Sequence, residues 1–303
     1  MQPGFLEMLS MQPALFIGLS VVVGLLFGSF LNVVIHRMPI MMDNELRAEC
    51  AALSGNELAG SEIPGKPAYN IVTPRSACPK CKAPITALQN IPVLSWLLLR
   101  GKCASCHTPI SLRYPLVELA TGILSGFIAW RFGFGLPGVA ALAFTWFLIA
   151  LTMIDFDTQY LPDALTYPLL WLGLIVSLWH PAWGEGAIPV GPRDSIIGAV
   201  AGYLSLWCVY WAFKWLTGKE GMGYGDFKLF AALGAWLGWQ MLLPIIVLAS
   251  GVGAIVGIAV MIRQHKGRDT VIAFGPFLAI AGWVAMVAGN DLVNRYFFFF
   301  TTD

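Results

Sequence analysis

The stretch Gly221–Lys228, GMGYGDFK, places an aspartate, Asp226, at the point where an apolar segment begins. A carboxylate costs about 2.5 to 3.5 kcal/mol at the centre of a membrane helix and less near an interface, so such a residue is a candidate for function. The three glycines of the stretch permit unusual backbone conformations and close approaches between chain segments. A second carboxylate that could work with Asp226 is therefore of interest.

The chain as a whole is strongly apolar. Of its 303 residues, 57% are hydrophobic and 12% are charged, whereas soluble domains carry about 25% charged residues. Apolar runs long enough to cross a bilayer, roughly 17 to 25 residues, recur along it. The sequence therefore predicts an all-α polytopic membrane protein with about eight transmembrane helices. They are expected at about 13–36, 114–131, 138–155, 164–179, 194–216, 228–242, 243–262 and 271–290.

A polar segment separates the first two predicted helices and holds nine of the 18 Lys and Arg residues. Basic residues concentrate in cytoplasmic loops, and a cytoplasmic position for this segment puts fifteen of the 18 on that side. The net charge of +1 gives no indication of a nucleic-acid partner, and none is expected. We predict a first membrane helix at 13–36 that stays as an anchor, a cytoplasmic domain at 37–113, a seven-helix membrane domain at 114–290 and an interfacial tail at 291–303.

Asp155, in the stretch IDFDTQYLPD, is the second carboxylate. In the predicted topology it ends the third helix at the cytoplasmic face, and Asp226 precedes the sixth helix at that face. Like charges held close together do not both ionise, so two aspartates at one site can act as general acid and general base. Asp157 is expected to face solvent and Asp163 to cap the fourth helix. Asp155 and Asp226 are therefore the predicted catalytic pair.

Further polar residues lie in or beside the predicted helices. Glu118 lies about one turn into the second helix, and Asn32 and His36 lie late in the first. Each could line a polar pocket with the two aspartates, and each could equally hydrogen-bond a neighbouring helix or lie at the membrane interface. Lys228, two residues after Asp226, is expected to be an interfacial anchor or a charge partner rather than a catalyst.

Four cysteines form two C-x2-C pairs, CPKC and CASC, with 21 residues between them; they are Cys78, Cys81, Cys103 and Cys106. Each such turn presents two thiolates to one metal ion, and four thiolates suit tetrahedral zinc. Two disulfides or a redox dithiol are the alternatives, and the predicted reducing compartment disfavours stable disulfides. We predict a structural zinc site, which would supply folding free energy to a segment with little hydrophobic core. The other two cysteines have no partner spacing.

Taken together, these motifs resemble the bacterial family of prepilin leader peptidases and N-methyltransferases. The resemblance covers almost the whole chain, where FGSFLNVVIHR, the two cysteine pairs, NIPVLSW, RYPLVEL, IDFDTQYLPD, GMGYGDFK and FGPFLAIAGW stand in the family's order. The GYGD element also resembles the GxGD signature of the wider class of intramembrane aspartyl proteases that includes presenilin. With an upstream aspartate and the cysteine quartet, the combination is highly specific.

The resemblance implies a multi-pass protein of the bacterial inner membrane with its active site at the cytoplasmic face. The family's catalytic aspartates fall on Asp155 and Asp226, and the four cysteines fall on its zinc-associated positions. The implied substrates are type IV prepilins and type II secretion pseudopilins, which lose a basic leader and are then methylated on the new N-terminal residue, usually Phe. S-adenosylmethionine is the implied methyl donor. The domain at 37–113 is the expected contributor to methyl transfer, and Gly101 is a candidate position in it.

Two other classes of protein remain as alternatives. A transporter or channel could use the two aspartates to carry protons or cations, and would show internal repeats. No convincing repeat is found, and the segment 37–113 has no counterpart in the second half of the chain. A non-catalytic assembly scaffold would tolerate replacement of either aspartate by Asn.

Overall fold

The computed structural model describes residues 5–53, 69–180, 190–264 and 273–301. Over these residues the regular structure is helical, apart from two isolated β-bridges in the mostly irregular segment 69–112. The chain divides into two compact units, Met1–Gly133 and Phe134–Asp303. The predicted all-α membrane fold is confirmed at this level, and each unit is considered by itself.

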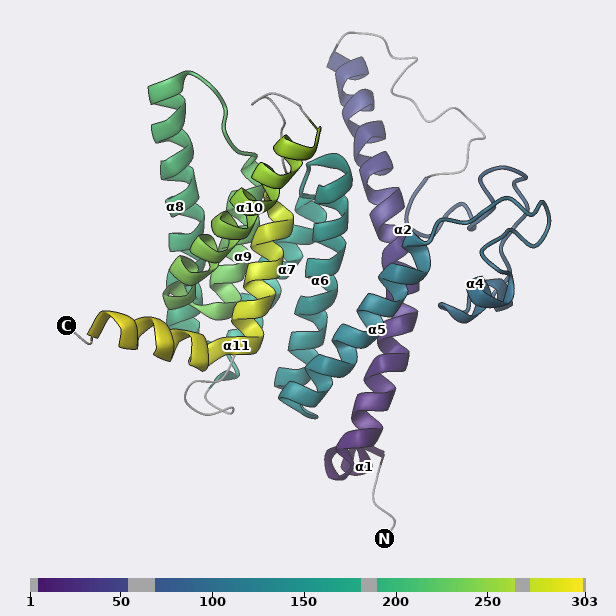
Figure 1. Cartoon of the computed structure of the whole chain (residues 1–303), viewed down its shortest axis with the longest axis horizontal. Helices are drawn as coiled ribbons and strands as arrows, with labels where there is room; N and C mark the ends of the chain where they lie inside the picture. The colour runs from purple at the N-terminus through teal and green to yellow at the C-terminus, as the bar shows by residue number, and fades with distance from the viewer. Residues whose placement is uncertain (1–4, 54–68, 181–189, 265–272, 302–303) are drawn as a thin grey trace. The chain divides into compact units, whose positions relative to one another are not determined.

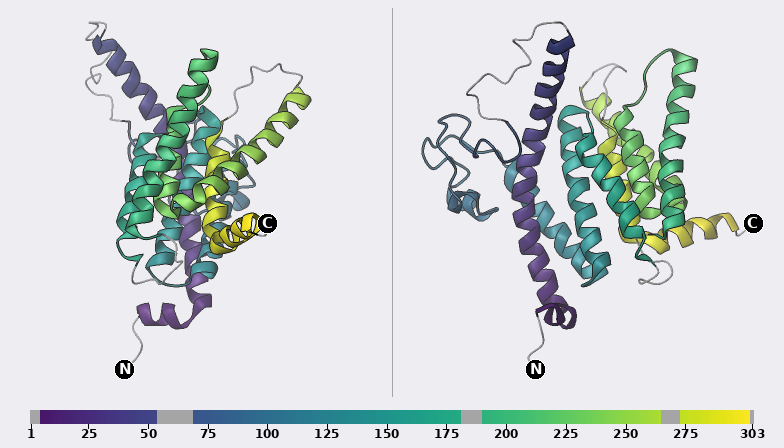
Figure 2. Two further views of the ribbon diagram at one scale, coloured as in Figure 1. Left: turned by 90° about the vertical axis from the view of Figure 1, so that its left-hand side faces the viewer. Right: turned by 180° about the vertical axis from the view of Figure 1, so that it is seen from behind.

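The first unit is built on two helices, α2 (Pro13–Leu53) and α5 (Arg113–Phe132), that pack against each other (Figure 1). α2 does not stop near residue 36, where the first span was predicted to end, and continues as one rod through Pro39 to Leu53 (Figure 2). The unit also contains α1 (Phe5–Met11), the 3-10 helix η1 (Leu88–Asn90) and α4 (Leu94–Leu98).

Small residues let the backbones of α2 and α5 approach closely. A Cβ added at Gly28 would lie 2.7 Å from the Cα of Glu118, and one added at Gly122 would lie 2.8 Å from the side chain of Leu25. Such contacts between backbones are the usual basis of helix association in a membrane. The crossing therefore fixes which residues of the two helices face each other.

Among the described residues, the second unit is a bundle of six helices with α9 at its centre, and the residues of α9 from Asp226 to its end are nearly all buried. α9 packs against α7, α8, α10 and α11. Glycines again mark the closest contact, because Gly198 of α8 lies directly against the backbone of Gly234. The helices are α6 (Leu136–Thr158), α7 (Asp163–Ser177), α8 (Pro192–Thr217), α9 (Tyr224–Leu237), α10 (Leu242–Gln264) and α11 (Gly275–Thr301), with the 3-10 helix η3 (Trp239–Met241) before α10.

The eight helices α2 and α5 to α11 lie where the eight spans were predicted. Among the described residues, four helices are long and apolar enough to cross a membrane, namely Pro13–Leu53, Leu136–Thr158, Pro192–Thr217 and Trp239–Arg263. Two shorter apolar helices lie at Asp163–Ser177 and Gly275–Gly289. Eight crossings therefore stay a prediction.

The C-terminal segment that was predicted as an interfacial tail is helical and belongs to α11. The helix is kinked at Gly289, which has φ 40° and ψ −122°, so its last part turns away from the first (Figure 2). The kink lies two residues before the predicted start of the tail at 291.

Candidate active site

Asp155 lies at the end of α6. The helix stops at Gln159, which adopts a left-handed conformation with φ 54° and donates its N–H to the carbonyl of Asp155 at 2.8 Å. The Asp155 side chain is buried, with 4% of its surface exposed. Its Oδ2 makes no hydrogen bond of good geometry in the part of the chain that the structure describes, and the backbone N–H of Gly275 is the donor that lies near the carboxylate. Burial of a carboxylate with so little hydrogen bonding is costly, so this side chain is a candidate for function.

Asp226 lies in the first turn of α9 and is also buried, at 8% exposure. The helix begins after Gly223, which has an extended backbone and no side chain that could cap the helix. A carboxylate in the first turn of a helix is favoured by the partial positive charge of the free N–H groups there. The fold thus tolerates an aspartate at a position that is otherwise packed with apolar side chains.

The glycines of the stretch GMGYGDFK serve close packing. None of the three has a positive φ, so the expectation of unusual backbone conformations was wrong. The expectation of close approaches is confirmed, because a Cβ at Gly221 would lie 2.8 Å from the ring of Phe213. A Cβ at Gly225 would lie 2.7 Å from the Cβ of Leu161. The turn before Asp226 is therefore pressed against α8 and against the connection between α6 and α7.

The two aspartates are close enough for the charge of Asp155 to act on Asp226. Leu161 packs against Gly225 of α9 and also against Gly275 of α11. A Cβ at Gly275 would lie 2.6 Å from Oδ2 of Asp155. The end of α6 and the beginnings of α9 and α11 therefore meet at one site, while the catalytic role of the aspartates stays a prediction.

Asp163 and Lys228 form an ion pair beside the aspartates. The Nζ of Lys228 donates to both carboxylate oxygens of Asp163, at 2.6 and 2.8 Å, and lies 5.1 Å from the centre of the Tyr167 ring. The predicted role of Asp163 as a helix cap was wrong, because the capping position is Pro162 and no side chain caps α7. The role of Lys228 as a charge partner is confirmed, and Asp157 is exposed as expected.

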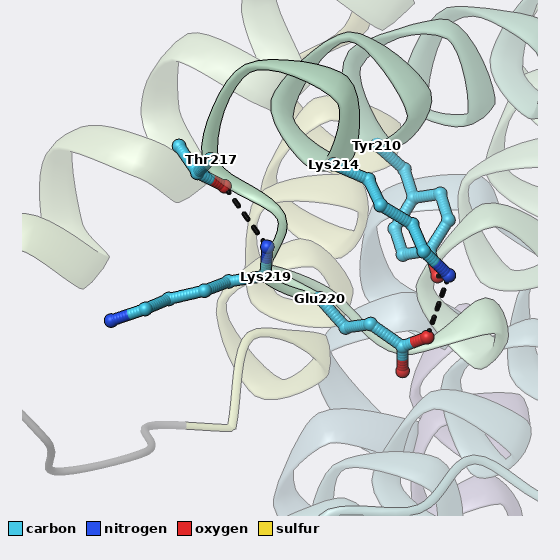
Figure 3. A network of polar contacts seen from close by, with 5 residues as sticks. All are labelled: Tyr210, Lys214, Thr217, Lys219 and Glu220. Carbon is cyan, nitrogen blue, oxygen red and sulfur yellow. Dashed lines mark hydrogen bonds and ion pairs between the residues drawn. The ribbon is translucent and has the colours of Figure 1, made fainter.

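A cluster of aromatic and charged residues lies between the end of α8 and the turn before Asp226. The ring of Tyr224 packs against the ring of Tyr210 of α8 at an angle of 52°, with ring centres 5.3 Å apart. Lys214 donates to Glu220 at 2.8 Å and to the hydroxyl of Tyr210 at 3.3 Å (Figure 3). The hydrogen bond from Lys214 lowers the pKa of the Glu220 carboxyl. These contacts attach the loop between α8 and α9 to the last turns of α8.

The four cysteines predicted as metal ligands come together in the first unit. Their Sγ atoms all lie within 4.8 Å of one another, and those of Cys78 and Cys106 are 3.7 Å apart. Tetrahedral zinc with bonds of about 2.3 Å to sulfur needs neighbouring sulfurs about 3.8 Å apart. All the cysteines are free thiols, so the alternative of two disulfides is not observed. The donor set and its geometry fit a zinc ion.

Each C-x2-C pair belongs to the same local turn, found in CPKCKAPI (78–85) and CASCHTPI (103–110). In each, the N–H of the first cysteine bonds the carbonyl of the residue five positions later at 2.9 Å, which is Ala83 in one turn and Thr108 in the other. The residue after the second cysteine has a positive φ in both. The Sγ of Cys106 lies 3.2 Å from the hydroxyl oxygen of Thr108, and hydrogen bonding with Thr108 lowers the pKa of that thiol to about 6, which favours the thiolate that a metal requires. The two eight-residue segments share the pattern C-x-x-C-x-x-P-I, from which no common turn was predicted.

The remaining candidates lie in the first unit. Glu118 accepts a hydrogen bond from the backbone N–H of Val93 at 2.8 Å, and Asn32 donates to the carbonyl of Tyr114 at 3.0 Å. His36 is exposed on α2. Gly101 has φ 68°, and a Cβ there would lie 2.7 Å from the ring of Trp96. Glu118 is thus joined to the segment NIPVLSW, a connection that helical spacing does not reveal.

Sequence reasoning missed Gly275 and Leu161. Gly275 belongs to the motif FGPFLAIAGW, which carries no ionisable group and therefore no chemical signal of its own. Leu161 stands in a short connection where one leucine is indistinguishable from any other apolar residue. Only the packing of α6, α9 and α11 shows that both contact the surroundings of the aspartates.

Comparisons with known proteins match both halves of the chain. A family model of the bacterial peptidase A24 N-terminal domain matches residues 22–132, and one of the type IV leader peptidase family matches residues 142–258. The prepilin leader peptidase/N-methyltransferase of Aeromonas hydrophila is 52% identical over 291 residues, which is 96% of this chain and 97% of that protein. The proteins of the same name from Pseudomonas aeruginosa and Neisseria gonorrhoeae are 49% and 50% identical, over 96% and 91% of this chain and 97% and 92% of their own lengths. No solved structure matches the chain.

Proposed function

Because this chain belongs to the family of prepilin leader peptidases and N-methyltransferases, we propose that it carries out both reactions on type IV prepilins and type II secretion pseudopilins. It removes the basic leader and then methylates the new N-terminal residue, usually Phe. The single observation that supports the first reaction most directly is the meeting of two buried carboxylates, Asp155 and Asp226, at helix ends that are far apart in sequence.

The two aspartates divide the work of peptide hydrolysis. Two carboxylates held close share one proton, so the ionised one polarises a water for attack on the scissile carbonyl. The protonated one donates a hydrogen bond to the carbonyl oxygen and stabilises the charge that develops there. The pair titrates as a unit, so the proton belongs to the dyad rather than to either residue.

The substrate and the site match in their position relative to the membrane. A prepilin carries a basic leader followed by an apolar helix, so its scissile bond lies at the boundary between cytoplasm and lipid. In the proposed topology, the end of α6 and the beginning of α9 lie at the cytoplasmic face of the bacterial inner membrane. The apolar exposed surfaces of the bundle helices, such as Val247 and Ile255 of α10, are suited to contact with lipid and with the substrate helix.

The cysteine quartet holds zinc in this proposal. Cys78 and Cys81 contribute one pair of thiolates and Cys103 and Cys106 the other, and the ion joins the two similar turns. Zinc supplies folding free energy here rather than an electrophile, since all four positions are taken by protein ligands.

The methyl transfer uses S-adenosylmethionine, and the domain at 37–113 contributes to it. The sequence contains no glycine-rich dinucleotide fingerprint between a strand and a helix, so a Rossmann-type site is not proposed. Gly101 is the position to test first, because a side chain there would meet Trp96.

The test is cleavage of a purified prepilin in detergent by the wild type and by Asp155→Asn and Asp226→Asn, read by mass spectrometry. Asp157→Asn is the matched control, because it makes the same change two residues away on an exposed side chain. Removal of an acid or base group lowers the rate by about 10²- to 10⁴-fold, so each dyad variant should leave the leader attached. Retained cleavage by either one would exclude the dyad. A folded wild type that does not cleave would favour a proton-coupled transporter or a scaffold.

A further inference from the structure

Glu118 of α5 is a half-buried carboxylate whose partners are all neutral. It accepts a hydrogen bond from the backbone N–H of Val93 at 2.8 Å, and its other polar neighbours, Ser29 and Asn32 on α2, are neutral. None of its partners in the part of the chain that the structure describes is a cation. Arg37, the buried cation of α2, donates to the backbone carbonyls of residues 70, 71 and 74 instead.

A carboxylate that is partly removed from water and lacks a counter-charge is destabilising. Neutral helix packing could be achieved at this position by Gln or by an apolar residue. A carboxylate that is held by a neutral backbone donor and has no counter-charge among its polar neighbours is suited to a positively charged ligand. The donor fixes the carboxylate and leaves its charge uncompensated until the ligand arrives.

The segment that contacts Glu118 is held in an uncommon conformation. Val93 has φ 59° and ψ −49°, and the N–H of Leu94 bonds the carbonyl of Pro92 at 2.5 Å. This is a γ-turn of the rare, strained form, and a β-branched residue is unfavourable at its centre. Such strain persists only where the surroundings enforce it, and it concentrates at functional positions. Here the turn directs the Val93 N–H at the carboxylate.

We propose that Glu118 binds the α-ammonium group of the substrate's new N-terminal residue, so that methyl transfer takes place beside it. Leader cleavage creates a primary α-amine, with a pKa of about 7.7 to 8.0, so most of it is cationic at neutral pH. Glu118 is the sixth residue of α5, about 7.5 Å along the helix axis from its start, and that start is at the cytoplasmic face in the proposed topology. This inference rests on the proposed bifunctional activity.

The Glu118 carboxylate also accepts the proton that the substrate ammonium must lose before its nitrogen can be methylated. S-adenosylmethionine supplies a methyl group on a sulfonium sulfur. The substrate ammonium first loses a proton to Glu118, and its nitrogen then attacks the methyl carbon as the carbon–sulfur bond breaks. The product is a methylated ammonium and a neutral thioether, and the proton passes from Glu118 to water.

The experiment compares the wild type with Glu118→Gln in detergent, using a synthetic peptide that begins at the Phe of a processed pilin. Gln keeps an oxygen that accepts the Val93 N–H and removes only the charge, so a purely structural role predicts no change. Binding is measured, without methyl donor, for the free-amine peptide and for the same peptide acetylated at its N-terminus. Glu220→Gln is the control for loss of an exposed carboxylate.

The wild type and the control should bind the free-amine peptide roughly ten- to a hundredfold more tightly than the acetylated one, the effect of a hydrogen bond to a charged group. Glu118→Gln should lose this preference and methylate the peptide correspondingly more slowly. A preference that survives in Glu118→Gln would overturn the inference.

Two further measurements need no folded variant. In the wild type, the preference should decline as the pH rises through the pKa of an α-amine, about 7.7 to 8.0. A wild type that binds both peptides equally would overturn the inference even if Glu118→Gln failed to fold. A wild type that neither cleaves nor methylates would contradict the proposed function itself, a result that is read separately from peptide binding.

Discussion

The contact between Gly275 and Asp155 makes a strong prediction about peptide cleavage. Replacing Gly275 by Ala would put a Cβ 2.6 Å from Oδ2 and 3.1 Å from Cγ of Asp155. An ordinary contact of a Cβ begins at 3.4 Å, so either the carboxylate or the first turn of α11 must move by about 0.8 Å. Gly275 does not have a positive φ, so its backbone accepts Ala and the effect is purely steric.

The expected loss follows from this displacement. A misplacement of about 1 Å at a catalytic group can cost roughly 10²-fold in rate. We expect kcat for leader cleavage by Gly275→Ala to fall by about this factor with little change in KM, because the substrate's remote contacts are untouched. The free energy of unfolding should fall modestly, by about 1 to 3 kcal/mol, as for other overpacked sites.

A matched control is available at the other aspartate. A Cβ at Gly223 has Asp226 Oδ2 as its nearest atom, at 3.9 Å, an ordinary contact. Gly223→Ala should therefore cleave at close to the wild-type rate. Cleavage by both variants is followed by mass spectrometry, and methylation of a pre-cleaved peptide reports whether each is folded. Wild-type kcat in a folded Gly275→Ala protein would refute the view that α11 sets the position of Asp155.

Three other perturbations have predictable outcomes. Asp163→Asn removes the partner of Lys228; in this ion pair the Asp163 side chain is 44% exposed and the Lys228 side chain 21%. We expect the free energy of unfolding to fall by up to about 1 kcal/mol. Thermal melting should show that it is restored when Lys228 is also replaced by Met. Cys78→Ser should release the metal, so purified wild type contains zinc and the variant does not; a wild type without zinc in elemental analysis would exclude the site. Glu220 has its pKa lowered by Lys214, so its stabilisation is complete above the unfolded carboxyl pKa of about 4.3 and disappears as the pH falls through the lower folded value. Glu220→Gln should therefore lower the melting temperature slightly at pH 7 in low salt and leave it unchanged in strong acid; an equal effect at both pH values would contradict the ion pair.

Much of the fold could be predicted because hydropathy is a local property of the chain. Apolar runs predicted the eight helices α2 and α5 to α11, and the predicted ends agree within a few residues for α5, α6, α7 and α8. The end of α2 was misplaced because a polar helix continues beyond the apolar run to Leu53, and polarity alone does not end a helix. The identity of Asp163 as an ion-pair partner was missed because Lys228 is 65 residues away and on another helix.

The sequence by itself determined the class of the protein, the cysteine quartet and the two aspartates, because these depend on composition, on short spacings and on the depth of a residue in an apolar run. Only the tertiary structure decided what surrounds the aspartates and which neighbours Glu118 has. Gly275, Leu161 and Val93 matter through steric contact and backbone direction, which arise when helices from distant parts of the chain pack together. A residue without charge or characteristic spacing carries no sign of that contact in the sequence.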